Sequence, residues 1–205
     1  MTSCLVLHIP HASTKIPADL RGTFLLSDQE LQAELDRITD HATDLIFQQA
    51  FPGVPAVVFP VSRLVVDPER FCDDSEEPMS QVGMGVLYSH GTLRQLIREK
   101  PSAPVRQRLL DQYYHPHHKK LTEKVDQILE EQDRCLIIDG HSFPSTALPY
   151  EINPKAARPD FCLGTDDFHT SPELLEAIEA ELQRLGYSTA CNEPFSGTIV
   201  PLKHY

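Results

Sequence analysis

Two histidines follow short apolar runs at widely separated points of the sequence. Cys4–Ile9 and Cys135–Asp139 each have the pattern of a buried strand, and His11 and His141 come just after them. In open α/β sheets, ligands bind beyond the carboxyl ends of the strands. Imidazole is the commonest metal ligand, and catalytic zinc uses three protein ligands. The pair makes a metal site a candidate, with Asp139 able to orient a ligand nearby. The residues alone still favour the alternative, in which each histidine caps its strand or hydrogen-bonds a loop carbonyl.

A third metal ligand should be an Asp, a Glu or a His. Asp36, Asp40 and Asp44 lie four residues apart in a segment with helical spacing. On one continuous helix Asp40 points away from the apolar stripe, so the residues alone favour a solvated acidic face. A helix break near Thr39 changes this prediction, because Thr39 then caps a new helix and Asp40 lies in its first turn.

Arg63, Asp67 and Arg70 form a charged group around the expected strand 64–67. Residues four apart on a strand share a face, so Arg63 and Asp67 can pair there. Guanidinium groups beside a metal are suited to an anionic substrate. The spacing is equally compatible with a purely structural ion pair at a strand edge.

The histidine-rich run Tyr113–Lys120 contains neighbouring residues that diverge by about 100° on a helix. We expect one of them at most, His118, to reach the site. His8 lies within the first strand and is expected to be buried and hydrogen-bonded rather than a ligand. The chain has no G-x-S-x-G, Walker or G-x-G-x-x-G motif, so the corresponding hydrolase and nucleotide-binding classes are unsupported.

The periodicity of the chain predicts strands alternating with helices. Ser27-Asp-Gln-Glu30 has the pattern of a capping box at the start of a helix, and Ser171-Pro172 opens another. The full set comprises strands at 4–9, 54–61, 64–67, 135–139, 187–191 and 198–202, and helices from 27, over 92–99, over 104–132 with a kink at Pro116, and from 171 to Gly186. This order predicts an α/β three-layer sandwich with a mostly parallel or mixed sheet.

Composition narrows the possible partners. The chain has 205 residues, with 18 Lys and Arg against 30 Asp and Glu, a formal charge of −12. This length suits a single domain, 1–205. The negative charge disfavours nucleic acid and anionic membrane surfaces. No apolar run is long enough to span a bilayer and no leader pattern is present, so we expect a cytoplasmic protein with a small-molecule partner.

The motifs together resemble the N-formylglutamate amidohydrolase family, in the family's order and over most of the chain. The matching segments are Pro10–Ser13, Thr39-Asp40, Ser62–Asp67 with Arg70, Gly85–Tyr88, Pro116–Leu121, Asp139–Ser142, Pro159–Gly164 and Phe195–Gly197. The resemblance implies a fold similar to zinc-dependent exopeptidases and hydrolysis of N-formylglutamate to formate and glutamate. It implies zinc bound by His11, Asp40 and His141, and hence a helix break at about Thr39.

The resemblance also implies how the substrate is held. Arg63 and Arg70 receive its carboxylates, Asp67 holds the arginines, and Ser142 and His118 complete the substrate-binding set. Zinc would polarise the formyl carbonyl and lower the pKa of water toward about 7. A carboxylate would then move the proton to the leaving amine.

The identity of this general base is open. Family members continue past the segment matching His204-Tyr205 into a strand that carries a glutamate, whereas this chain ends at Tyr205. The sequence is therefore a truncated product, or another carboxylate such as Glu193 serves, or the protein is a non-catalytic metal-binding homologue. A related zinc amidase or peptidase with another acyl substrate is a further alternative.

Overall fold

The computed structural model describes residues 4–151, 153–155 and 158–205, which form two compact units. Unit 1 comprises the chain up to Phe143 together with residues 200–205, and unit 2 comprises Pro144–Ile199. A single family domain over 1–205 stays a prediction. All the residues expected at the metal and substrate sites belong to unit 1.

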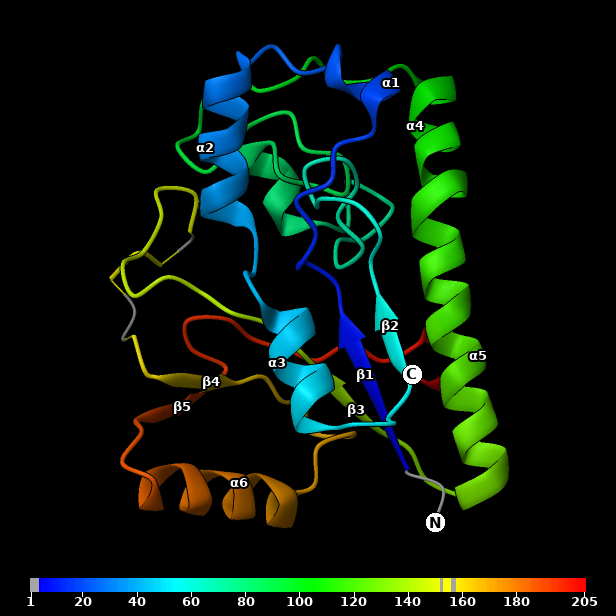
Figure 1. Ribbon diagram of the computed structural model, residues 1–205, viewed down its shortest axis with the longest axis vertical. Helices are drawn as coiled ribbons and strands as arrows, with labels where there is room; N and C mark the ends of the chain where they lie inside the picture. Colours follow the sequence, from blue (N-terminus) through cyan, green and yellow to red (C-terminus); the bar gives the residue numbers. More distant parts are fainter. Residues whose placement is uncertain (1–3, 152, 156–157) are drawn as a thin grey trace. The chain divides into compact units, whose positions relative to one another are not determined.

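Unit 1 is built on a 3-stranded parallel sheet in the order β2-β1-β3 (Figure 1). The central strand β1, Leu5–Ile9, pairs with β2, Ala56–Val58, and with β3, Leu136–Asp139. β1 is apolar along almost its whole length because both of its faces are covered. The predicted α/β class with a parallel sheet is confirmed.

Two helices cover opposite faces of this sheet. The His8 side chain of β1 contacts His117 of α5, His115–Gln132. Asp139 is paired with His8 and lies on the same face, so the next residue, Gly140, faces the other way. A Cβ atom on Gly140 would come within 2.7 Å of the Phe47 ring of α3, Thr43–Ala50. The sheet of unit 1 therefore lies between α3 and α5.

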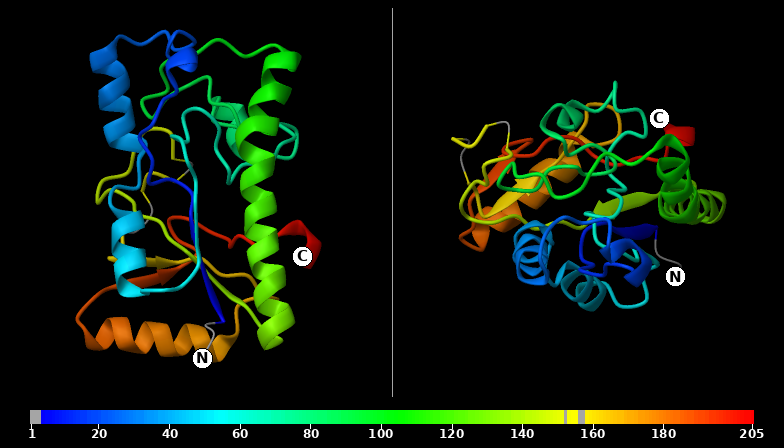
Figure 2. Two further views of the ribbon diagram at one scale, coloured as in Figure 1. Left: turned by 45° about the vertical axis from the view of Figure 1, so that its right-hand side comes forward. Right: turned by 90° about the horizontal axis from the view of Figure 1, so that it is seen from above.

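The remaining helices of unit 1 are α1, Ala18–Arg21, α2, Asp28–Ile38, and α4, Ala103–Leu109. The predicted capping box at Ser27 and Glu30 starts α2. A π-helical turn, Leu110–Tyr114, joins α4 to α5, so the segment forms one long rod (Figure 2). The predicted interruption lies just before Pro116, whose missing N–H removes a helical hydrogen bond. Short 3₁₀ turns occupy Pro78–Val82 and Leu202–His204.

Unit 2 contains a small parallel pair, β4, Phe161–Leu163, and β5, Thr189–Cys191. The helix α6, Pro172–Arg184, connects the two strands. Ser171 caps α6 through its side chain, as the sequence predicted, and Gly186 follows it with a positive φ of 89°.

Several predicted elements are wrong. The segment 92–99 is a turn rather than a helix, because buried Glu34 accepts the Thr92 amide at 2.5 Å and the Gln95 side chain at 2.9 Å. The segment 64–67 is a turn rather than a strand, since the Val65 amide bonds the Ser62 carbonyl. Residues 198–201 are irregular, and β2 is shorter than predicted, between Pro55 and Pro60.

Candidate metal centre

The carboxyl edge of the sheet brings the two strand-end histidines together. His11 follows β1 and His141 follows β3, and their ring centroids are 5.1 Å apart. The side chain of His11 is 2% exposed, whereas that of His141 is 36% exposed. The site therefore has one buried histidine and one at its solvent side.

Asp40 reaches the same place because the helix breaks before it. α2 ends at Thr39, which is extended, and Ala42 adopts a left-handed φ of 61° before α3. The Asp40 amide donates to the His11 carbonyl at 3.0 Å, which turns this loop toward the sheet. The break near Thr39 is confirmed, although Thr39 ends α2 instead of capping α3.

Asp40 lies between the two histidines. One of its oxygens, Oδ2, is 2.9 Å from Nδ1 of His141 and 3.8 Å from Nδ1 of His11, and it accepts the Ser142 amide at 3.2 Å. Burial alone would raise the pKa of Asp40, but contacts with His11 and His141 outweigh it and lower the pKa below its usual range. Asp40 is therefore an ionised carboxylate at this centre.

Asp67 fixes the orientation of His11. The Nε2 atom of His11 donates to Oδ1 of Asp67 at 2.9 Å, so Nδ1 is the ring nitrogen that remains for another ligand. This Nδ1 atom is buried and has no hydrogen-bond partner. A buried polar nitrogen without a partner is costly unless it binds something, and a metal cation fits it.

Glu69 is a member of the centre that the sequence reasoning missed. Its oxygens lie 3.1 and 3.2 Å from Nε2 of His141, and Oε2 lies 3.6 Å from Nδ1 of His11. Its amide donates to Asp67 at 3.0 Å, which holds it next to His11. The spacing Asp67-Pro-Glu69 could have indicated this residue. A turn after Asp67 brings Glu69 back toward His11, which Asp67 binds.

His11, His141 and a carboxylate oxygen of Glu69 present ligand atoms within 4.8 Å of one another. Asp139 also contacts His141, with Oδ2 3.3 Å from Nε2. Burial lowers the pKa of His141, but Glu69 and Asp139 outweigh it and raise the pKa well above the usual value. The carboxylates here outnumber the neighbouring guanidinium groups. A divalent cation would balance the remaining negative charge.

The charged group Arg63, Asp67 and Arg70 is assembled by a turn instead of the expected strand. Arg63 donates twice to Asp67, at 2.8 and 3.1 Å, and the Tyr88 hydroxyl donates to the same oxygen at 2.5 Å. Nε of Arg70 lies 3.9 Å from Asp67. Burial would raise the pKa of Asp67, but Arg63, His11 and Arg70 hold it well below its usual range.

The histidine run of α5 contributes His117 to the sheet. His117 is 5% exposed and contacts His8, which is fully buried, as the sequence reasoning expected of His8. His118 instead contacts the Pro68 carbonyl at 2.8 Å, beside Asp67 and Glu69. His118 therefore lies at the edge of the charged group, and its role in substrate binding stays a prediction. Ser142 is exposed and contacts Asp40 through its backbone amide.

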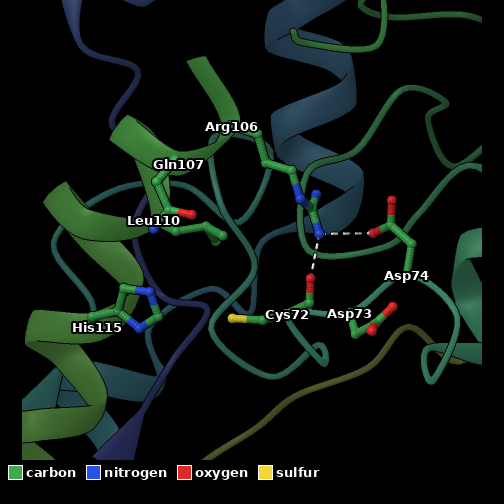
Figure 3. A pocket seen from close by; sticks show the side chains of 7 residues that line it. All are labelled: Cys72, Asp73, Asp74, Arg106, Gln107, Leu110 and His115. Carbon is green, nitrogen blue, oxygen red and sulfur yellow. Dashed lines mark hydrogen bonds and ion pairs between the residues drawn. The ribbon is translucent and has the colours of Figure 1, made fainter. Parts of the chain in front are cut away.

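A separate surface hollow contains ionisable side chains but none of the candidate metal ligands (Figure 3). Arg106 contacts the Cys72 carbonyl and Asp74 there, at 3.0 Å to the latter. The other lining residues are Asp73, Gln107, Leu110 and His115. The hollow is thus distinct from the candidate metal centre at the carboxyl edge of the sheet.

The fold and the site together define an α/β protein with a group of histidines and carboxylates at the end of a parallel sheet that could hold a metal ion. The family model described as FGase, N-formylglutamate amidohydrolase, matches residues 3–205. The chain belongs to the N-formylglutamate amidohydrolase family.

Curated relatives agree with this assignment. The chain is 28% identical over 211 residues to an N-formylglutamate deformylase of Pseudomonas putida, covering 98% of this chain and 74% of that protein. It is 30% identical over 212 residues to one from Pseudomonas aeruginosa, with the same coverage.

Solved structures are similar as well. The crystal structure of N-formylglutamate amidohydrolase from Ralstonia eutropha JMP134 matches with a TM-score of 0.80 and 26% identity, covering 95% of this chain and 74% of that one. A gene product of Agrobacterium tumefaciens, Atu2144, shares the fold, with a TM-score of 0.71 and 17% identity over 94% of this chain and 69% of that one. Among the described residues, no helix is long and apolar enough to cross a membrane.

Proposed function

We propose that this protein is a zinc-dependent amidohydrolase that cleaves N-formylglutamate to formate and glutamate. The observation that carries the proposal is the convergence of His11, Asp40 and His141, with a buried Nδ1 atom of His11 that lacks a hydrogen-bond partner. The membership of the family and the names of the two deformylases support the substrate. We also propose, as parts of this function, that the fold is similar to that of zinc-dependent exopeptidases and that the bound metal is zinc.

We assign the metal ligands as Nδ1 of His11, Oδ2 of Asp40 and Nδ1 of His141. In both histidines the Nε2 atom faces carboxylates, Asp67 for His11 and Glu69 with Asp139 for His141. A carboxylate accepts hydrogen bonds, so each ring would keep its proton on Nε2 when a cation lies between its Nδ1 atom and Asp40. Glu69 then lies beside the cation without being one of the three ligands.

A divalent cation held by His11, Asp40 and His141 would supply Lewis-acid polarisation of the amide carbonyl and a lowered pKa for a water molecule. The surrounding residues bind and orient the substrate. Arg70 is 20% exposed, and its Nε atom is buried without a hydrogen-bond partner, so it can receive a substrate carboxylate. Arg63 is held by Asp67 and is 11% exposed, which makes it a more rigid second cation for an acidic substrate.

The test is turnover by the purified, zinc-loaded chain. We expect release of glutamate from N-formylglutamate and much less hydrolysis of N-formylleucine, which lacks the side-chain carboxylate. His11→Ala should lose both bound zinc and turnover, whereas the exposed-face variant Asp36→Asn should retain both. No glutamate release at high enzyme concentration, with zinc bound, would contradict the proposed substrate.

Arg70→Ala separates carboxylate recognition from chemistry. A charge-assisted hydrogen bond contributes about 1.5–3 kcal/mol, so kcat/KM for N-formylglutamate should fall about 10–100-fold. Zinc content should be unchanged. An equal loss on N-formylleucine would show that Arg70 does not recognise the side-chain carboxylate.

A further inference from the structure

A continuous line of side-chain contacts, buried at its α5 end, connects α5 to His141. Nε2 of His117 lies 2.8 Å from Nε2 of His8, and Nδ1 of His8 lies 2.7 Å from Oδ1 of Asp139. The second oxygen of Asp139 lies 3.3 Å from Nε2 of His141. His8 is fully buried. Neither His8 nor His117 is needed as a metal ligand, so their polar contacts require another explanation.

The chemistry of the groups determines the direction of each hydrogen bond. A carboxylate has no N–H to offer a ring nitrogen, so Asp139 is the acceptor in its 2.7 Å contact with His8. His8 must donate from Nδ1. A neutral ring that donates from Nδ1 has its lone pair on Nε2, and Nε2 of His8 is the atom that contacts His117.

His117 must therefore donate from Nε2 to His8. Burial, together with His8, lowers the pKa of His117 to about 2, which keeps the ring neutral. The edge of the His117 ring packs against Phe59 at a centroid distance of 5.0 Å, which fixes its plane. The donor is consequently held in place by packing as well as by its helix.

We propose that His117 and His8 are positioning residues that hold Asp139, and through it the metal ligand His141, in the orientation that binds the cation. This inference rests on the metal site of the proposed function. His8 and Asp139 are direct partners across β1 and β3, so the sheet sets the spacing of the central contact. If His117 did not donate, His8 could shift its proton to Nε2, and its Nδ1 lone pair would then face the carboxylate of Asp139.

A second cation at His8 is the competing arrangement. His8, Glu69 and Asp139 present ligand atoms within 4.8 Å of one another. The 2.7 Å contact between His8 and Asp139 is a hydrogen-bond distance, however, and a proton on Nδ1 removes the lone pair that a metal needs. The positioning arrangement predicts one metal ion per chain.

The first experiment compares His117→Leu with His117→Gln in the full chain. Leucine removes the donor, whereas the glutamine amide places an N–H near the position of Nε2. Zinc affinity, measured by competition with a chelator, should fall about tenfold in His117→Leu and recover in His117→Gln. His115→Leu, on the exposed side of the same helix, is the matched control. Equal affinity of the leucine variant and the wild type, or equal loss in both His117 variants, would overturn the inference.

The second experiment uses the wild-type protein and so does not depend on a variant that folds. Imidazole ¹⁵N NMR of the zinc-loaded chain should show His8 protonated at Nδ1 only and His117 at Nε2 only. A His8 ring protonated at Nε2 or at both nitrogens, or two zinc ions per chain, would overturn the positioning role alone. A wild-type chain that binds no zinc would overturn the proposed function and this inference together.

Discussion

At the scale of single residues, the centre depends on carboxylates that set which nitrogen of each histidine is free. Asp67 is the most connected of them, since it accepts from His11, Arg63, Tyr88 and the Glu69 amide. It is fully buried, so removing its charge would weaken all four of these contacts where water cannot replace them.

Asp67→Asn tests this role. Asparagine has the shape of aspartate, but its side-chain NH2 group would face the N–H and O–H donors that now bind Asp67. It also carries no negative charge that would favour a proton on Nε2 of His11. Zinc affinity should fall about 10–100-fold, and stability should fall by about 3–5 kcal/mol because Arg63 loses its buried partner. Chelator competition and urea unfolding measure the two effects. Asp36→Asn, on the exposed face of α2, should change neither.

The raised pKa of His141 gives a pH dependence of metal binding. Without a cation His141 holds its proton through neutral pH, because Glu69 and Asp139 outweigh burial and raise the pKa well above the usual value. Zinc must displace that proton, so affinity should rise by about tenfold for each pH unit between pH 6 and 8. Calorimetry in buffers of different ionisation enthalpy should show proton release on binding. An affinity that is constant over this range would contradict the assignment.

At the scale of elements, the break between α2 and α3 decides whether Asp40 enters the site. Ala42 adopts φ 61° to start α3 without a side-chain cap. A left-handed conformation is unfavourable for alanine and acceptable for glycine, so this loop carries a small strain that the inward contacts of Asp40 offset.

Ala42→Gly should therefore stabilise the protein by about 0.5–1 kcal/mol and leave zinc affinity unchanged. Ala33→Gly, inside α2, should instead destabilise the protein, because glycine costs about 1 kcal/mol in a helix interior. Urea unfolding of the two variants measures both changes. A destabilised Ala42→Gly would mean that the left-handed residue is not strained.

At the scale of the whole molecule, a metal that binds only the folded chain stabilises it by mass action. A ligand at 100 times its dissociation constant contributes about 2.7 kcal/mol. For a chain of this length, we expect removal of zinc to lower Tm by about 5–10 °C. Calorimetry of the zinc-loaded and chelated forms checks the shift, and His11→Ala should show the same Tm with and without zinc.

Local patterns were sufficient for much of unit 1. The apolar runs before His11 and His141 predicted two strands of a parallel sheet, and the common carboxyl edge of such a sheet brings these residues together. The Ser27–Glu30 capping box, and the Ser171 cap in unit 2, could also be predicted, since each involves residues three apart. These features depend on backbone geometry that a few neighbouring residues specify.

Tertiary contacts decided what the local patterns could not. Periodicity alone pointed Asp40 to solvent, but a hydrogen bond to His11 and the turn at Ala42 bring it inward. Glu34 converted a helical pattern at 92–99 into a turn across 58 residues of sequence. Packing on the sheet selected His117 over His118 for the buried contact. Residue types and strand ends therefore indicated several side chains that could bind a metal, although not Glu69. Long-range hydrogen bonds and burial select which of them meet, and those contacts leave no periodic signal in the sequence.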